Sequence, residues 1–351
     1  DLALDFLSIG PFTAFEGAFY AEDEIAVSDR VGISAGVRYS FFTHTGPYTE
    51  YLYEESSLLS DSTVYSAGEV LAFYHHPEPR LSAVYRLDER SSLKAGYMHM
   101  AQYVHLGTSS TVSLPTDIWL PSTSEIKPQY SDQVSLGYYH TWLDGRYEGS
   151  AEIYFKHSRN QVEFIRGVIS SSLNLDLLEN ITTGVGRAYG LELFLKRKEG
   201  RLTGWAGYAL SRSERVFDRI NDGRVYPAKF DRRHDISIAG VYELNERWNA
   251  SAVFVYVSGN AFTLPVGRYI IQGNLVNQYG RTNNYRMPAY HRMDLSFTRT
   301  VTTARGNRSV WDFSVYNIYN RSNPFYVYFE TTGDLESYSL EVNPVIVSLF
   351  P

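Results

Sequence analysis

The chain has 351 residues, of which 44% are hydrophobic and 20% are charged. Its formal net charge of −7 argues against a nucleic-acid partner, which would require a basic face. No cysteine is present, so disulfides and thiolate metal sites are excluded. The mean hydropathy is negative and no apolar run approaches the roughly 20 residues of a membrane helix, so any crossing of a membrane must use strands.

An alternation of apolar and polar residues with period two dominates the sequence. It is clearest at 31–41, where Val31, Val37 and Tyr39 share one face while Arg38 and Ser40 share the other. Segments 133–142 and 190–196 alternate in the same way. One face suits lipid and the other suits a wet interior. A soluble β-sandwich also alternates, but it gives no reason for loops that are long on one side only.

Short polar turns and long polar loops alternate along the chain. The six short turns are 28–30, 88–91, 143–145, 198–200, 245–247 and 304–308. Around them the pattern predicts strands near 17–27, 31–42, 79–87, 92–105, 130–142, 146–164, 184–196, 201–212, 232–244, 248–257, 290–300 and 309–319, with a thirteenth starting at 345–350. The long connections are 43–78, 106–129, 165–183, 213–231, 258–289 and 320–344, and the prolines are expected to be confined to them.

These elements predict an all-β fold, a transmembrane antiparallel up-and-down β-barrel with short periplasmic turns and long extracellular loops. Aromatic residues make up 15% of the chain. Many lie near predicted strand ends, where interfacial rings are expected: Tyr39, Phe41, Phe42, Tyr138, Tyr139, Trp142, Trp248, Tyr319, Tyr326 and Tyr328. Twelve or thirteen strands would leave two edges open in lipid, so we expect residues 1–351 to be part of a larger barrel.

Five segments carry a resemblance to a known family. They are Phe19–Glu24 with Gly36–Tyr39, Leu114–Pro121 with Ile126–Gln129, Phe230–Asp235, Arg286–Leu295 and Asn317–Pro324. In residues and order they resemble the barrel of TonB-dependent outer-membrane receptors, of the Bacteroidetes type that carries a carboxypeptidase-regulatory-like N-terminal extension.

The resemblance implies a 22-stranded barrel closed by an N-terminal plug that imports a scarce nutrient. Residues 1–351 would then be the C-terminal part of the barrel, without the plug and the early strands. The implied partners are outer-membrane lipids and lipopolysaccharide, an inner-membrane energy-coupling complex acting through the plug, and a small ligand. A siderophore, haem, vitamin, oligopeptide or oligosaccharide would all be compatible, and no cofactor is expected. The implied location is the outer membrane of a Gram-negative cell.

Two groups of residues are candidates for functional roles. Charged residues on inward faces and strand starts are expected to form a lumen charge network: Arg38, Asp231, Arg232, Arg233, Asp235, Arg292 and Asp294. Loop residues that could contact a ligand are Asp117, Trp119, Tyr48 and Tyr51, with structural anchoring of the loops as the alternative.

Other chemistry has weaker support in the sequence. His75 and His76 are adjacent, but no ligand at metal-binding spacing accompanies them, so no metal site is predicted. No G-x-S-x-G elbow is present, and the chain is not expected to be an enzyme. Two alternatives to import remain, a structural or adhesive barrel and an outer-membrane hydrolase. The hydrolase would use His140 and His157, which lie on adjacent predicted strands and face outward.

Overall fold

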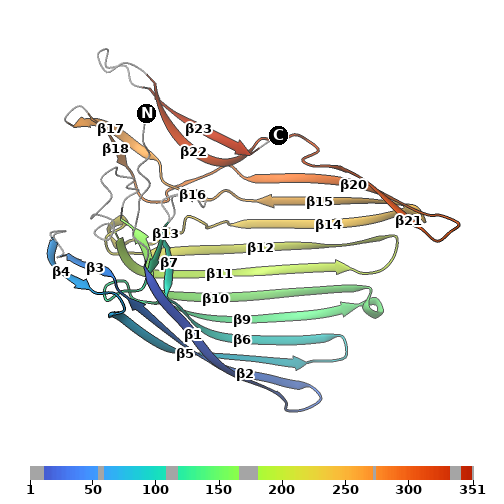
Figure 1. Cartoon of the computed structure of the whole chain (residues 1–351). Helices are drawn as coiled ribbons and strands as arrows, with labels where there is room; N and C mark the ends of the chain where they lie inside the picture. Colours follow the sequence, from blue (N-terminus) through green and yellow to red (C-terminus); the bar gives the residue numbers. More distant parts are fainter. Residues whose placement is uncertain are drawn as a thin grey trace.

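Twelve antiparallel strands form one continuous curved wall in chain order (Figure 1). The computed structural model describes residues 12–53, 59–107, 118–165, 181–271, 274–332 and 341–349. The strands of the wall are β1 Thr13–Ala26, β2 Val31–Thr45, β5 Val70–Arg86, β6 Ser91–Gln102, β9 Gln129–Trp142, β10 Tyr147–Phe164, β11 Ile181–Arg197, β12 Leu202–Val216, β14 His234–Asn245, β15 Trp248–Val257, β20 Tyr290–Thr302 and β21 Arg308–Val315. All twelve predicted strands of the wall are confirmed.

The six short turns also lie where the sequence predicts them, all at one end of the wall (Figure 1). In some of these turns a polar side chain near the start accepts hydrogen bonds from backbone amides. Ser28 Oγ accepts a hydrogen bond from the Val31 amide at 3.1 Å, and Asn245 Oδ1 accepts one from Trp248 at 3.1 Å. At 143–145 the backbone instead turns through positive φ angles, which reach 93° at Gly145, a conformation that glycine adopts without strain.

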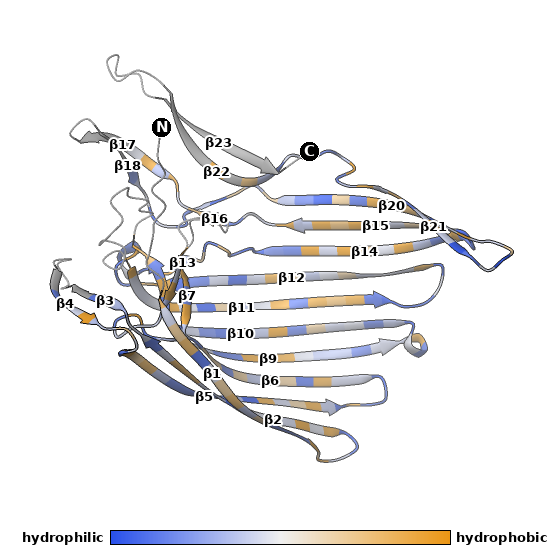
Figure 2. Ribbon diagram, viewed as in Figure 1, coloured by the Kyte–Doolittle hydropathy of each residue, from blue (hydrophilic) through white to orange (hydrophobic). Residues whose placement is uncertain are grey.

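The two faces of the wall differ in burial as the alternation predicts. On β2, Val37 and Tyr39 are 45% and 43% exposed, whereas Ser40 and Phe42 on the opposite face are buried. Figure 2 shows the resulting alternation of hydrophilic and hydrophobic residues along the strands. Phe42 corrects one expectation. It does not lie at the membrane interface but points inward and stacks on Tyr103, with ring centroids 5.3 Å apart, because it shares the face of Ser40.

Small hairpins and short strands occupy the long connections. Those described are β3 Tyr48–Tyr53 with β4 Leu59–Tyr65, β7 Val104–Gly107 with β8 Ile118–Pro121, β16 Ala261–Phe262 with β19 Tyr285–Arg286, β17 Pro265–Ile271 with β18 Asn274–Tyr279, and β13 Tyr226–Pro227, which pairs with β12. The thirteenth strand predicted at 345–350 is part of β23 Glu341–Leu349, which pairs with β22 Asn323–Thr332 in a separate sheet. In the described part of the chain no helix is long and apolar enough to span a membrane.

β5 begins nine residues before its predicted start and contains Pro77 and Pro79, so the expectation that prolines lie only in loops is wrong here. Both prolines oppose residues of β2, Tyr39 and Val37. On its other side β5 pairs with β6 only from Arg80 onward. The first half of β5 is therefore an edge on that side, and proline is tolerated on an edge because the missing N–H has no ladder partner to lose.

Candidate functional site

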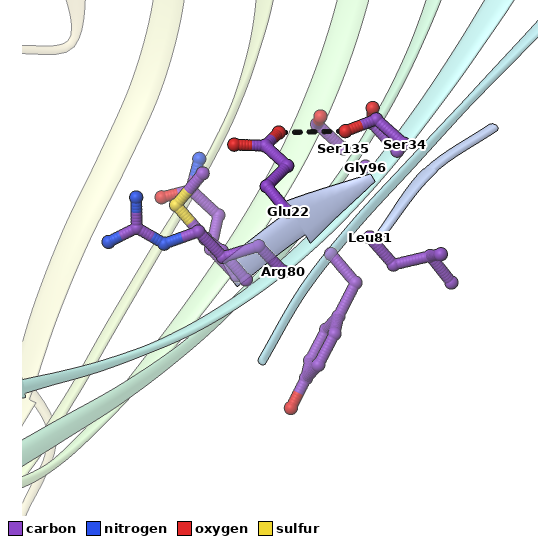
Figure 3. A pocket seen from close by; sticks show the side chains of 10 residues that line it. Glu22, Ser34, Arg80, Leu81, Gly96 and Ser135 are labelled. Carbon is purple, nitrogen blue, oxygen red and sulfur yellow. Dashed lines mark hydrogen bonds between the residues drawn. The ribbon is translucent and has the colours of Figure 1, made fainter. Parts of the chain in front are cut away.

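The inward face of the wall carries a polar hollow of about 130 Å³ between β1, β2, β5, β6 and β9. Glu22 accepts a hydrogen bond from Ser34 Oγ at 2.8 Å, and Arg80 lies beside them. Figure 3 shows Glu22 and Arg80 on one side of the sheet and Leu81 on the other. Gly96 lines the same hollow, and a Cβ there would lie 3.3 Å from Ser135 Oγ. This face therefore presents charges and hydroxyls to the interior, as a wet lumen requires.

Arg38, one of the predicted lumen residues, is held between two carboxylates. Its guanidinium lies 3.6 Å from Glu78 and 4.0 Å from Glu16, which come from β5 and β1. Glu78 is buried, whereas Arg38 is partly exposed on the inward face. The cluster ties three neighbouring strands together near the long-loop end.

Asp231 forms an ion pair with Arg286, in which the carboxylate is buried and the arginine is exposed. Asp231 is 1% exposed, and its other oxygen accepts a hydrogen bond from the Ser213 amide at 2.5 Å. Its partner lies 55 residues further along the chain and not in its own charged segment. The ion pair thus connects the segment that precedes β14 with β19 at the long-loop end of the wall.

Two other charged residues of the 231–235 segment contact neutral side chains. Arg232 Nε donates to Asn260 Oδ1 at 2.8 Å, and Asp235 accepts a hydrogen bond from Ser237 Oγ at 3.5 Å. Within the described residues neither Arg232 nor Arg233 forms an ion pair with a carboxylate. Arg232, Arg233 and Asp235 therefore keep their charges unpaired, within the described residues, at the long-loop end of the wall, which is the mouth of the lumen.

A second buried charge cluster, missed by the sequence analysis, lies beside it. Glu163 of β10 is paired with both Arg215 and Lys229, the latter at 3.6 Å. Next to it, Tyr226 packs in a small apolar core with Phe217 and other buried residues, and burial raises the pKa of the Tyr226 hydroxyl. No sequence signal could have linked these residues, because they come from three separate elements.

Arg292 and Asp294, two members of the predicted lumen charge network, form an ion pair 3.0 Å apart on the inward face of β20. The Arg292 guanidinium also lies 3.9 Å from the centre of the Tyr316 ring and donates to Tyr290 Oη at 3.1 Å. Asp294 Oδ1 accepts a hydrogen bond from the Asn317 amide at 2.9 Å, so it also fixes the turn after β21. Arg38, Asp231 and Arg292 thus belong to three separate clusters.

The candidate ligand residues are only partly described. Trp119, on β8, is 56% exposed, and Tyr48 at the start of β3 lies with its ring 5.1 Å from that of His44. Tyr51 is in β3, but its side chain lies outside the described part of the chain, as does the whole of Asp117. Ligand contact by these four residues stays a prediction.

His75 and His76 diverge into different surroundings. His75 Nδ1 lies 2.7 Å from Tyr39 Oη, whereas His76 Nε2 lies 2.6 Å from His99 Nε2. His99 Nδ1 in turn lies 2.6 Å from Asp132. The hydrogen bonds from His76 through His99 to Asp132 lie where β5 and β6 separate. Their spacing in the sequence did not predict them.

The histidine pair suggested for a hydrolase is not a pair in space. His140 is opposite Gly149 in the β9–β10 ladder and His157 is opposite Asp132, which places them eight positions, or about 27 Å, apart. His140 Nδ1 does lie 2.7 Å from Ser91 Oγ. However, the carboxylate near this contact, Asp88, is hydrogen-bonded to Ser91 and interacts with His140 only through its charge, so it does not hold the imidazole in the orientation of a general base.

The comparisons with known proteins agree with this architecture. Residues 7–320 match the family described as TonB dependent receptor-like, beta-barrel, and the chain belongs to this family. TonB-dependent receptors are transporters of the Gram-negative outer membrane, and the short turns are accordingly periplasmic. No curated protein sequence matches the chain.

Several solved structures share its fold. The ferric yersiniabactin uptake receptor FyuA from Yersinia pestis has 16% identity and a TM-score of 0.59, with 95% of this chain and 44% of that chain covered. The ferripyoverdine receptor from Pseudomonas aeruginosa has 13% identity and a TM-score of 0.57, covering 90% and 35%. The ferric-catecholate import receptor Fiu from E. coli has 15% identity and a TM-score of 0.56, covering 89% and 41%. The chain thus spans less than half the length of these receptors, and at such identities the likeness shows the fold alone.

Proposed function

We propose that this chain is the C-terminal part of the barrel of a TonB-dependent receptor that imports an anionic iron chelate, a ferric siderophore, through a plugged lumen. The observation that carries the proposal is the two-faced wall. Charges and hydroxyls such as Glu22, Arg38 and Asp235 line one face, whereas large apolar side chains such as Val37 cover the other. A wall of this kind separates lipid from a polar path, as importing a hydrophilic solute requires.

The choice of ligand class is supported by the mouth and by the structural relatives. Arg232 and Arg233 keep their positive charge at the long-loop end, and Arg232 is exposed. Positive charge at the entrance of a cleft attracts an anionic solute and raises its local concentration. The similar structures named above are receptors for ferric siderophores by their own descriptions.

Uptake by a deletion strain tests the proposal. Cells without the gene, grown under iron limitation, are expected to lose uptake of one radiolabelled ferric siderophore from a panel, and the full-length gene should restore it. Arg232→Gln should weaken this uptake while the barrel still assembles, because the Arg232 side chain is exposed and, in the described part of the chain, donates to Asn260 alone. Unchanged uptake of every iron chelate would overturn the ligand class. Unchanged uptake of haem, vitamins, peptides and glycans as well would overturn import and favour a scaffold.

A further inference from the structure

The outward face of the wall holds an apolar hollow of about 530 Å³ near the short-turn end. It spans β9 to β14 and lies on the face that meets lipid. Pockets of this volume are in the range that binds drug-sized ligands. The hollow is unrelated to the lumen and to the mouth described above.

The strand register shows why the wall is hollow here. Two neighbouring rows of outward residues cross the strands at this level, and each contains small residues between larger ones. One row is His140, Gly149, Leu195, Ala206 and Ile238, and the other is Tyr138, Ala151, Leu193, Tyr208 and Ile236. Gly149 and Ala151 on β10 and Ala206 on β12 therefore leave low areas on the two sides of Leu193 and Leu195 of β11.

The next row toward the turn is aromatic and basic. It consists of Trp142, Tyr147 and Arg197, which are directly opposite one another on β9, β10 and β11. The Arg197 guanidinium lies 5.6 Å from the centre of the Tyr147 ring. Arg197 Nε donates to the Glu199 carbonyl at 3.1 Å, and among the described residues no carboxylate pairs with it.

An unpaired arginine on a lipid-facing surface is stable only where it meets water or phosphate. Arg197 is the last residue of β11 and adjoins the turn 198–200, so it lies at headgroup depth. The two turns around it, at 143–146 and 197–201, hold four basic residues (Arg146, Arg197, Lys198 and Arg201) and two acidic ones. Lys198 is paired with Glu148, and Asp144 with Arg90. Three arginines then remain against one acidic residue, Glu199, so this part of the rim is positive although the whole chain carries a net charge of −7.

From these observations we infer that the outward face of β9–β14 binds one anionic glycerophospholipid of the periplasmic leaflet, with its phosphate on Arg197 and an acyl chain in the hollow above Gly149, Ala151 and Ala206. The arginine supplies a forked donor for phosphate oxygens, and its positive surroundings favour a phosphatidylglycerol headgroup over a zwitterionic one. The site depends on the barrel lying in the outer membrane, not on what it imports.

A second outward arginine provides a matched control. Arg299 is directly opposite Trp248 and lies 5.7 Å from that ring, which repeats the arrangement of Arg197 and Tyr147. The adjacent row there is Ala250, Phe297 and Phe313, so two large rings stand next to Arg299. Arg299 thus has the cation and the aromatic ring but lies away from the hollow, which is lined by β9 to β14.

Native mass spectrometry of the full-length protein in detergent tests the site, with phosphatidylglycerol and phosphatidylethanolamine of the same acyl chains as probes. We expect one phosphatidylglycerol to bind more tightly than phosphatidylethanolamine. Arg197→Gln should weaken its binding roughly fivefold, the effect of losing one surface charge near an anionic headgroup. Ala206→Phe should reduce binding of both lipids, because the ring would fill the hollow.

Control variants make the outcome decisive. Arg299→Gln and Ala35→Leu, an outward substitution on β2 away from the hollow, should leave phosphatidylglycerol binding unchanged. Heat-dependent gel mobility checks that each variant forms a folded barrel. Equal binding of the two lipids by the natural protein, or unchanged binding after both Arg197→Gln and Ala206→Phe in folded protein, would overturn the inference.

Discussion

Single residues at the mouth divide into those that hold the structure and those that are free to act. Asp231 is buried and has its charge balanced by Arg286, whereas Arg232, its neighbour in sequence, is exposed and contacts an amide. The sequence suggested one network for both. The structure gives the two residues different roles. A buried charge such as that of Asp231 must have a partner, whereas an exposed charge such as that of Arg232 need not, and burial depends on the fold.

Removing Arg286 should destabilise the structure around Asp231 at the long-loop end. Arg286→Gln leaves the buried Asp231 carboxylate without its counter-charge, and because Arg286 itself is 38% exposed the expected cost is about 1–3 kcal/mol. The Ser213 amide, which donates to Asp231, should then exchange its hydrogen roughly a hundredfold faster. Hydrogen exchange by mass spectrometry measures this, with Arg232→Gln as the control. Equal protection in the two variants would contradict the structural role of Asp231.

His105 should make the β7–β8 hairpin sensitive to pH. Burial lowers its pKa to about 4, against the 6.5 of an exposed histidine, and its Nε2 lies 3.2 Å from Ser122 Oγ. Because the unfolded hairpin takes up a proton below pH 6.5 and the folded one does not until about pH 4, stability is full above pH 6.5. It falls as the pH drops toward 4, by up to about 3 kcal/mol.

The readout is hydrogen exchange of residues 104–107 and 118–122 at pH 7.5 and pH 5, corrected for intrinsic exchange rates. Protection should be lower at pH 5, and His105→Gln, which does not titrate, should lose most of the difference. A pH dependence that is equally large in the variant would show that another group controls the hairpin.

At the scale of elements, the period-two pattern was sufficient to find every strand of the wall, because each strand has one face in lipid and one in a polar interior. It failed where a strand leaves that environment. The first half of β5 lacks a partner on one side and carries two prolines, so its pattern looked like a loop. The sequence also could not predict contacts that depend on strand register, such as the His99–Asp132 contact and the distance between His140 and His157.

The assignment of faces predicts opposite outcomes for neighbouring positions on β9. Leu136 points outward and is 49% exposed, whereas Ser135 points inward and lines the polar hollow. Leu136→Arg should destabilise the barrel by about 2–4 kcal/mol if it lies near the middle of the bilayer, and Ser135→Arg should be tolerated. Urea-dependent unfolding in lipid vesicles compares the two. A greater loss for Ser135→Arg would mean that the faces are reversed.

At the scale of the whole molecule, the twelve strands in chain order have two ends, β1 and β21, that no described strand of the wall joins. A sheet in lipid must close on itself, since unpaired backbone groups cost several kcal/mol each there. The solved receptors with this fold are more than twice as long as the part that matches. We therefore propose that the wall is one portion of a larger closed barrel with a plug.

The most direct test of this account is the denatured mass of the protein extracted from its native outer membrane and detected with an antibody to one of the long loops. A mass of roughly twice the 40.0 kDa of this chain is predicted, because a 22-strand barrel with a plug needs that much polypeptide. A mass near 40.0 kDa would mean that the chain closes a smaller barrel or pairs with another subunit, and it would contradict the plugged receptor.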